Sequence, residues 1–256
     1  MPWNPDTYHQ FEKERSAPFD DLMQLIERRD GLTVIDLGCG TGELTRRLAD
    51  ALPHSDVLGI DSSPHMLAKT AAQVRAGLRF ERAQLEEVTG QWDVVFSNAA
   101  IQWVEDHPAL IPRLLSLVRP GGQLVVQLPS NHKAPAHMTI LATASEAPFQ
   151  AALNGWTRQS PVLTVGEYAE LLYQHGGRNL TVFEKVYPHV LENAEAVRDW
   201  TRGTALVPYL ERLPADLHEA FLARYTERLR TKWPTSPAFF GFNRILFAAN
   251  LDSASA

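Results

Sequence analysis

The stretch that decides the fold is Val34-Ile-Asp-Leu-Gly-Cys-Gly-Thr-Gly42, in which an apolar run leads directly into glycines at every second position. The run Thr33–Leu37 is typical of a buried strand, and the following segment, about Glu43–Ala51, has a helical pattern. Glycine lets the backbone turn sharply and lets a ligand approach without a Cβ in the way. A loop that binds a dinucleotide pyrophosphate has the different spacing G-x-G-x-x-G. The spacing G-x-G-x-G, preceded by Asp36, therefore favours a ligand with a cationic amino group over a phosphate.

A second carboxylate narrows the choice of ligand. Gly59-Ile-Asp61 ends the next apolar run, and Asp61 follows Gly42 by 19 residues. A carboxylate at the end of this strand is placed to accept hydrogen bonds from both hydroxyls of a ribose. S-adenosylmethionine has such a ribose, and its aminocarboxypropyl tail carries the cation. Taken alone, the glycines also fit a tight turn without a ligand, and Asp61-Ser62-Ser63 also fits a helix cap.

Further candidates for this ligand follow the other predicted strands. Met66 lies one helical turn after Ser62, where it would cover the adenine or pack in the core. Gln84 offers an acceptor to the adenine amine and Leu85 offers a backbone N–H. Asn98 ends the fourth strand in the same crevice. We therefore predict that the cofactor-binding residues are Asp36, Gly38, Cys39, Gly40, Gly42, Asp61, Ser62, Met66, Gln84, Leu85 and Asn98.

The order of the predicted elements indicates an α/β fold. Five short runs rich in Val, Ile and Leu alternate with helical patterns between residues 33 and 128, as in a parallel sheet covered on both faces. Helical segments and two more strands, near Thr181–Leu191 and Phe242–Ala249, follow. We predict a single domain over residues 1–256. It would comprise an N-terminal helical cap (1–30), a cofactor-binding core (31–130) and the remaining sheet edge (131–256), with a helical lid at about 192–235.

The composition indicates the cellular compartment and excludes some classes of binding partner. The chain has 24 Lys and Arg against 30 Asp and Glu, a formal net charge of −6, which disfavours unspecific binding to nucleic acid or anionic membranes. Cys39 is the single cysteine, so we expect a reducing compartment. The segment Met1–Ser16 lacks the apolar core that a signal peptide has. No apolar run approaches the ~18–20 residues that a membrane helix needs. We expect a cytoplasmic monomer with a small-molecule substrate and no nucleic-acid or membrane partner.

Together, the glycine loop, the two acidic residues and the strand order resemble the class I methyltransferases over about residues 33–128. The resemblance implies a Rossmann-like sheet of seven strands with the last one antiparallel, and S-adenosylmethionine as cofactor. It implies that the glycines of the loop contact the methionine portion and that Asp61 binds the ribose. Gln84 and Leu85 would lie at the adenine, although many members of the family have Asp at the position of Gln84.

Further stretches from about residue 3 to residue 249 include Trp3-Asn-Pro-Asp-Thr-Tyr8, Gly59-Ile-Asp-Ser-Ser-Pro64, Ser97-Asn-Ala-Ala-Ile-Gln-Trp103, Val126-Gln-Leu-Pro129, Asp199-Trp200 and Arg244-Ile-Leu-Phe247. In these stretches the chain is similar to a narrower group, the bacterial trans-aconitate 2-methyltransferases. The resemblance implies methyl transfer to a carboxylate of a small polycarboxylic acid, with a monomethyl ester as product. Ser130-Asn131 and Val207 depart from the usual residues of the group.

Methylation of a carboxylate requires little acid–base catalysis from the protein. A carboxylic acid with a pKa near ~4 is already ionised at neutral pH, so we predict no catalytic acid or base and no metal. We interpret His107 as a helix cap or core residue. The protein must instead position the anion, and arginines grip carboxylates with two hydrogen bonds. The predicted substrate-binding residues are Trp3, Tyr8, Arg15, Gln102, Trp103, Arg202, Tyr209 and Arg244.

Two alternatives stay open at this point. One is a methyltransferase that acts on an oxygen or carbon of another small molecule, for which a base-dependent step would make a His or Asp essential. The other is a protein that binds S-adenosylmethionine without turnover.

Overall fold

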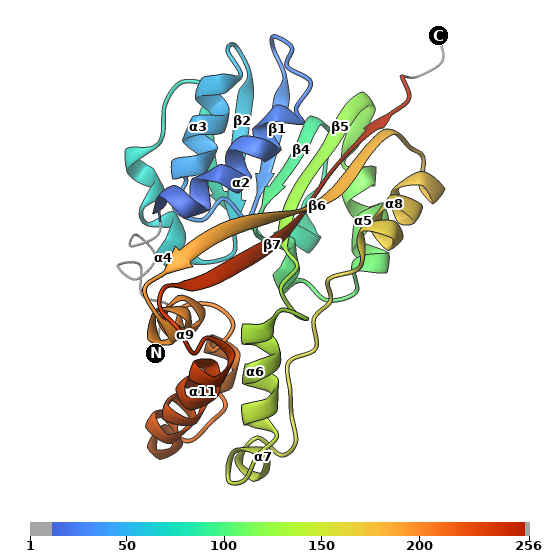
Figure 1. Ribbon diagram of the computed structural model, residues 1–256. Coiled ribbons are helices and arrows are strands. Elements are labelled where there is room, and N and C mark those ends of the chain that lie inside the picture. Colours follow the sequence, from blue (N-terminus) through green and yellow to red (C-terminus); the bar gives the residue numbers. More distant parts are fainter. Residues whose placement is uncertain (1–11, 254–256) are drawn as a thin grey trace. The chain divides into compact units, whose positions relative to one another are not determined.

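The computed structural model describes residues 12–253, with side chains from residue 16 onward, and the chain divides into two compact units (Figure 1). The first, the sheet unit, comprises Ala17–Pro129, Pro161–Lys185 and residues 244–253. The second, the helical unit, comprises residues 12–16, Ser130–Ser160 and Val186–Asn243.

Seven strands form one sheet in the order β3-β2-β1-β4-β5-β7-β6. Neighbouring strands from β1 to β5 pair in parallel, whereas β7 pairs with β5 in the antiparallel direction, with Pro129 opposite Arg244. The predicted seven-stranded sheet with an antiparallel last strand is therefore confirmed. The strands are β1 (Thr33–Leu37), β2 (Asp56–Asp61), β3 (Leu78–Arg82), β4 (Trp92–Asn98), β5 (Val118–Pro129), β6 (Gly177–Leu191) and β7 (Ala238–Leu251).

Helices cover both faces of the sheet. They are α2 (Glu12–Gln24), α3 (Glu43–Ala51), α4 (Pro64–Leu67), α5 (His107–Ser116) and α8 (Val165–Gln174), with 3₁₀ turns at Thr70–Ala72, Leu85–Glu87 and Ile101–Trp103. Successive residues of a strand point to opposite faces, so Val34 packs in one core with Phe19 of α2. Ile35 packs in the other core with Leu114 of α5 and Tyr168 of α8. This double burial explains why the strand runs do not alternate between polar and apolar residues.

Side-chain caps fix the starts of two helices. The Ser63 hydroxyl accepts a hydrogen bond from the Met66 backbone N–H at 3.3 Å, with Pro64 at the first helical position. At the start of α8, the Thr164 hydroxyl accepts from the Glu167 N–H, and the Glu167 carboxylate accepts from the Thr164 N–H at 2.7 Å. This reciprocal pair satisfies two backbone N–H groups that the helix leaves unpaired.

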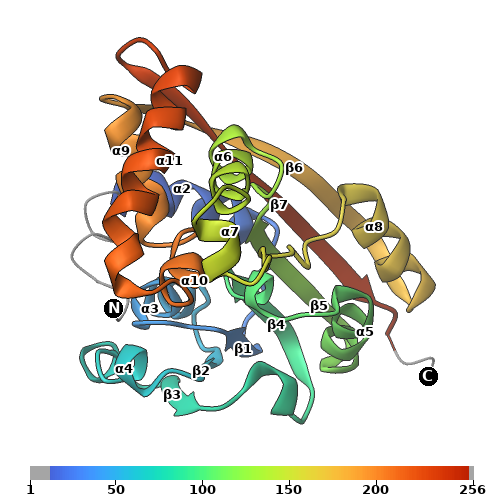
Figure 2. The same ribbon diagram turned by 90° about the horizontal axis from the view of Figure 1, so that it is seen from below.

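The helical unit has its own apolar core. It is built from α6 (Pro135–Ala144), α7 (Phe149–Ala152), α9 (Ala194–Arg202), α10 (Val207–Leu210) and α11 (His218–Lys232), with a 3₁₀ turn at Ala215–Leu217. α11 packs against both α6 and α9 (Figure 2), and the core between the helices contains Phe149, Trp200, Phe221 and Tyr225. The predicted lid at about 192–235 coincides with α9 to α11, and α6 and α7 add to its core. That the segment closes as a lid, and that residues 1–256 act as one domain, stay predictions.

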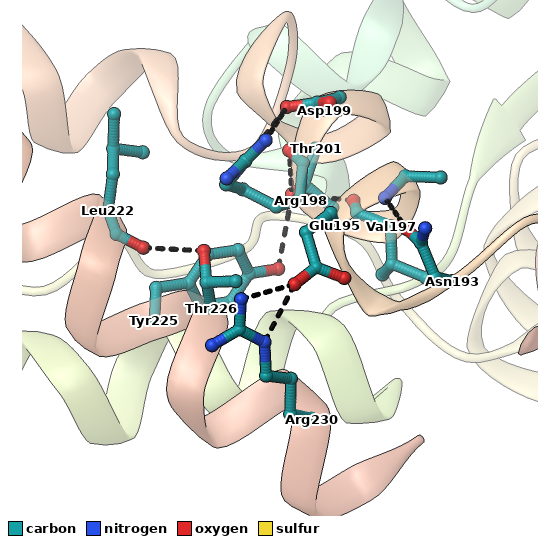
Figure 3. A network of polar contacts seen from close by, with 11 residues as sticks. Asn193, Glu195, Val197, Arg198, Asp199, Thr201, Leu222, Tyr225, Thr226 and Arg230 are labelled. Carbon is teal, nitrogen blue, oxygen red and sulfur yellow. Dashed lines mark hydrogen bonds and ion pairs between the residues drawn. The ribbon is translucent and has the colours of Figure 1, made fainter. Parts of the chain in front are cut away.

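Polar contacts fix the junction of α9 and α11 (Figure 3). The Arg230 Nε donates to Glu195 Oε1 at 2.7 Å, and the Tyr225 hydroxyl lies 3.1 Å from the Thr201 hydroxyl. Asn193 caps the start of α9 by accepting from the Ala196 N–H at 2.9 Å. Between residues 12 and 253, no helix is both long and apolar enough to cross a membrane.

Candidate cofactor and substrate site

The glycine loop is a tight turn that its neighbours constrain closely. The backbone N–H groups of Gly38 and Cys39 both donate to the Ile60 carbonyl, at 2.9 and 2.8 Å. Gly38 and Gly40 have φ of +83° and +57°, values that residues with a Cβ rarely adopt. A Cβ on Gly38 would lie 2.3 Å from the Ala100 Cβ, whereas a Cβ on Gly40 would meet the end of Met66 at 3.1 Å. Gly38 is thus required by the fold itself, and Gly40 borders the predicted adenine residue Met66.

Asp61 ties the loop to the end of β2. Its Oδ2 accepts from the Gly40 N–H at 3.0 Å, and its Oδ1 accepts from the Ser63 N–H at 2.8 Å. Each carboxylate oxygen has two acceptor positions. Asp61 therefore organises the loop and retains acceptor capacity for the predicted ribose hydroxyls.

Asp36 lies beneath the loop and is only 3% exposed. Its Oδ2 accepts from the Thr45 hydroxyl at 2.6 Å, while Oδ1 is buried and has no hydrogen-bond partner in the described part of the chain. Burial raises the pKa of this carboxyl group to about 7, the Thr45 hydrogen bond opposes the rise, and the charge of Asp61 adds to it. A cation bound at the loop would favour the ionised form of Asp36.

Cys39 is buried in the same loop. Burial, followed by the charges of Asp36 and Asp61, raises the pKa of its thiol. A thiol that stays protonated is a poor nucleophile, so the predicted role of Cys39 is limited to its backbone and its shape.

The remaining predicted cofactor residues lie at the ends of neighbouring strands. Asp61 pairs with Arg82 in the register of β2 and β3, so Gln84, two residues beyond Arg82, follows at the same edge of the sheet. Gln84 is exposed and precedes the turn that begins at Leu85, and Ser62 is exposed beside Asp61. Asn98 ends β4 and is partly buried. The structure therefore brings the predicted set to the carboxyl ends of β1 to β4, where open α/β sheets bind ligands.

Comparisons with known proteins agree with this geometry. Residues 34–122 match the family described as methyltransferase domain. The trans-aconitate 2-methyltransferase of Deinococcus radiodurans is 49% identical over 97% of this chain and 98% of its own length. That of Variovorax paradoxus is 37% identical over 91% of each chain. The chain belongs to the trans-aconitate 2-methyltransferase family.

Solved structures of lower identity share the fold. The YcgJ protein of Bacillus subtilis superposes with a TM-score of 0.61 at 12% identity, over 93% of this chain and 99% of that one. Haemonchus contortus phosphoethanolamine N-methyltransferase 2, in complex with S-adenosyl-L-methionine, superposes with a TM-score of 0.55 at 17% identity, over 93% and 53%.

In this family member, the segment after β4 carries two predicted substrate residues. Gln102 Nε2 donates to the Ala99 carbonyl at 2.7 Å, and the Trp103 side chain is 55% exposed. His107, which follows, is fully buried at the start of α5. One ring nitrogen bonds the Tyr168 hydroxyl and the other lies 2.9 Å from the Ile101 carbonyl. This confirms His107 as a core residue, and Asp106 caps the helix through the Ala109 N–H.

The arginines that we predict to bind the substrate differ in their burial and in their hydrogen bonds. Arg244 is partly buried in β7, and its Nη1 donates to Gln127 Oε1 at 3.1 Å. Arg202 is exposed in the last turn of α9. Arg15 lies in α2, with its side chain outside the described part of the structure, and Trp3 and Tyr8 lie outside the described residues altogether.

Tyr209 is buried in the helical unit, where its hydroxyl accepts from the Arg158 backbone N–H at 3.2 Å.

Two polar residues that contact predicted substrate residues, Gln127 and Arg158, were not predicted from the sequence. The sequence signal for Gln127 is an amide inside an apolar strand run, and the structure shows this amide fully buried. Arg158 stands in an irregular segment and has no such signal. Among residues 12–253, no group of three or more His, Cys, Asp or Glu is arranged to hold a metal ion.

Proposed function

We propose that this protein transfers a methyl group from S-adenosylmethionine to a carboxylate of trans-aconitate, giving a monomethyl ester and S-adenosylhomocysteine. The observation that carries the proposal is 49% identity, over nearly the whole of both chains, to a trans-aconitate 2-methyltransferase. The glycine loop with Asp36 and Asp61 supports the choice of cofactor.

The residues of the sheet unit fit this cofactor. The buried Oδ1 of Asp36, which has no hydrogen-bond partner among residues 12–253, would provide negative charge beneath the loop, where the amino group would bind. A Cβ on Gly40 would narrow the space beside Met66, so glycine keeps that approach open. We propose that Gly38, Cys39, Gly40 and Gly42 hold the methionine portion, that Asp61 and Ser62 hold the ribose, and that Met66, Gln84, Leu85 and Asn98 complete the site.

The proposed reaction needs positioning more than proton transfer. S-adenosylmethionine supplies a methyl group on a positively charged sulfur. A carboxylate oxygen of the acid bonds to the methyl carbon while the bond from that carbon to sulfur breaks, its electron pair staying on sulfur. No proton moves, because the acid is already ionised at neutral pH. Both ring nitrogens of His107 are engaged within the core, which agrees with a reaction that needs no base.

The work left to the protein is to bind the acid, to align it and to exclude water. We propose Arg244 as a cation that holds one carboxylate, since it begins one of the stretches that carry the family resemblance and the Gln127 amide orients its guanidinium. Arg15, Arg202, Tyr209, Gln102 and Trp103, with Trp3 and Tyr8, stay proposed contacts. We also propose that the protein acts as a cytoplasmic monomer without nucleic-acid or membrane partners, in keeping with its net charge of −6.

A substrate panel tests the proposal. The intact protein is incubated with methyl-labelled S-adenosylmethionine and, separately, with trans-aconitate, cis-aconitate, tricarballylate, citrate and the monocarboxylate crotonate. We expect a product from trans-aconitate that releases labelled methanol in mild base, and little product from crotonate. A base-stable product would indicate methylation of another atom, and cofactor binding without turnover of any acid would reject the proposed function.

A further inference from the structure

Two glutamines, Gln123 and Gln127, lie four residues apart on β5, and both are almost completely buried. Alternate residues of a strand point to the same side of a sheet, so both side chains face the core that contains Val125. A glutamine amide accepts hydrogen bonds at its oxygen and donates them from its nitrogen. Each of these buried side chains therefore has two ends that need a partner.

The two amides differ in how they are paired. The Gln123 Oε1 accepts from the Glu27 N–H at 3.1 Å, and its Nε2 donates to the Leu25 carbonyl at 2.9 Å. The Gln127 Oε1 accepts from Arg244 Nη1 at 3.1 Å. The Gln127 Nε2, however, is buried and has no hydrogen-bond partner among the described residues. Gln123 thus fastens the segment after α2 to the sheet, whereas the nitrogen of Gln127 makes no hydrogen bond within the described part of the chain.

Arg244 determines which end of the Gln127 amide is left over. A guanidinium carries only donors, so the amide must turn its oxygen toward Arg244, and the reverse orientation would set N–H groups against N–H groups. A buried donor without a partner destabilises a folded protein, and an apolar side chain of similar shape would avoid that cost. A ligand that accepts a hydrogen bond from Nε2 would explain why an amide stands at this position.

The unpaired donor lies at the edge of the sheet where the cofactor site is proposed. In the register of β4 and β5, Gln127 is the direct partner of Asn98, the last residue of β4 and a proposed cofactor residue. In the register of β5 and β7, Arg244 is opposite the residue two positions beyond Gln127. The three side chains share one face of the sheet, because each lies two residues from a member of the same apolar core, namely Phe96, Val125 and Leu246.

A carboxylate fits this row of side chains. Each of its two oxygens has two acceptor positions, so it can accept from a guanidinium and from an amide nitrogen together. The guanidinium supplies the opposite charge, and the amide adds a hydrogen bond without a second buried charge. Methyl transfer also requires the acid to lie beside the cofactor, and Asn98 is the direct neighbour of Gln127 in the sheet.

We propose that Gln127 is itself a binding residue for the acid substrate, and that its Nε2 donates a hydrogen bond to the carboxylate that Arg244 holds. The inference rests on the proposed function for the identity of the acid and for the role of Arg244. It goes beyond that function by adding a neutral donor that the predicted substrate set does not contain. All of the residues involved belong to the sheet unit.

Kinetics of three variants test this role. Gln127→Met removes both ends of the amide, Gln127→Glu keeps an oxygen toward Arg244 but adds a negative charge, and Gln123→Met is the matched control from the same face of β5. Both changes at Gln127 should raise the KM for trans-aconitate by about tenfold or more, as expected for a lost hydrogen bond to a charged group. Gln123→Met should leave it within about twofold of wild type, and the KM for S-adenosylmethionine should stay within about twofold in all three.

A wild-type KM for trans-aconitate in Gln127→Met overturns the proposal, and if that variant does not fold, the same result in Gln127→Glu does so. Thermal unfolding adds a readout of the structural role. Gln123→Met leaves the Glu27 N–H and the Leu25 carbonyl without their partner, so it should lower the Tm more than Gln127→Met, which removes a donor that has no described partner. A larger loss of Tm in Gln127→Met would show that this amide serves the fold, and would overturn the proposal.

A binding measurement separates this role from the reaction. The side-chain NH2 resonances of Gln127 and Gln123, assigned by their absence in the two methionine variants, are followed by NMR in protein saturated with S-adenosylhomocysteine, which has no methyl group to transfer. Trans-aconitate should shift the resonances of Gln127 and not those of Gln123, and inorganic phosphate at the same ionic strength should shift neither.

The outcomes distinguish the two proposals. An absent shift at Gln127, or an equal shift with phosphate, overturns the role of Gln127, and the proposed function stands if trans-aconitate is still methylated. A shift at Gln127 without turnover of any acid supports the role in binding and rejects the proposed function.

Discussion

At the scale of single residues, Asp36 shows how a buried charge can serve binding at the expense of stability. Its carboxyl group is desolvated and, within the described part of the chain, accepts one hydrogen bond, from Thr45. Burial raises the carboxyl pKa to about 7 in the folded protein, against an ordinary value of 3.8 for a free side chain. Between these values the folded state binds more protons than the unfolded state. The contribution of Asp36 to stability is therefore fully present below about pH 4 and is lost as the pH rises to about 7.

We predict that Asp36→Asn flattens the pH dependence of stability of the ligand-free protein between pH 4 and 7, because the variant has no proton to lose there. The same change should weaken S-adenosylmethionine binding at pH 8 by about tenfold or more, which corresponds to about 1.4 kcal/mol. Urea unfolding across this pH range and calorimetry at pH 8 measure the two effects. Unaltered cofactor affinity would remove Asp36 from the site, and an unaltered stability profile would contradict the raised pKa.

At the scale of elements, the glycine loop between β1 and α3 carries most of what could be predicted from the sequence. Its spacing and the carboxylate at the end of β2 indicate the fold class and the edge of the sheet at which we propose that the cofactor binds. Those signals are local, because turn geometry and strand burial each need only a few neighbouring residues. The contact between Arg158 and Tyr209 has no such signal, since the two residues are 51 positions apart and only the tertiary fold brings them together.

Two glycines of the loop should respond differently to the same change. We predict that Gly38→Ala destabilises the whole protein, because its Cβ would overlap the Ala100 side chain at 2.3 Å. Gly40→Ala should fold with a smaller loss, of about 1–2 kcal/mol for its positive φ, yet lose cofactor affinity. Thermal unfolding and cofactor titration of both variants provide the comparison. If Gly40→Ala bound the cofactor like wild type, Gly40 would serve the turn alone.

At the scale of the whole molecule, the chain passes from the helical unit into the sheet unit within β7, between Asn243 and Arg244. The predicted family and the Rossmann-like sheet are confirmed. The assignment of α6 and α7 to the same core as α9 to α11 was not foreseen, because it depends on long-range packing of residues such as Phe149 and Phe221. The predicted substrate residues are distributed over both units, and their roles stay predictions.

Arg244, the first residue of the sheet unit after this passage, provides a test at that scale. We predict that Arg244→Ala lowers kcat/KM for trans-aconitate at least tenfold and leaves the affinity for S-adenosylmethionine unchanged, because the lost charge would face only the acid. Arg178→Ala, which removes a more exposed arginine beside Asp252, is the matched control. Equal kcat/KM values for wild type and Arg244→Ala would exclude Arg244 from the substrate site.

The setting of Cys39 has a practical consequence for spectroscopy. The chain has no other thiol, and this one is buried with a pKa raised well above neutrality, so maleimide reagents should leave the folded protein unlabelled. Cysteines introduced at exposed positions, one in each unit, could then be labelled with a donor and an acceptor dye in the native background. Energy transfer between the dyes, recorded while cofactor and acid are added in turn, would report directly whether the helical unit moves during the catalytic cycle.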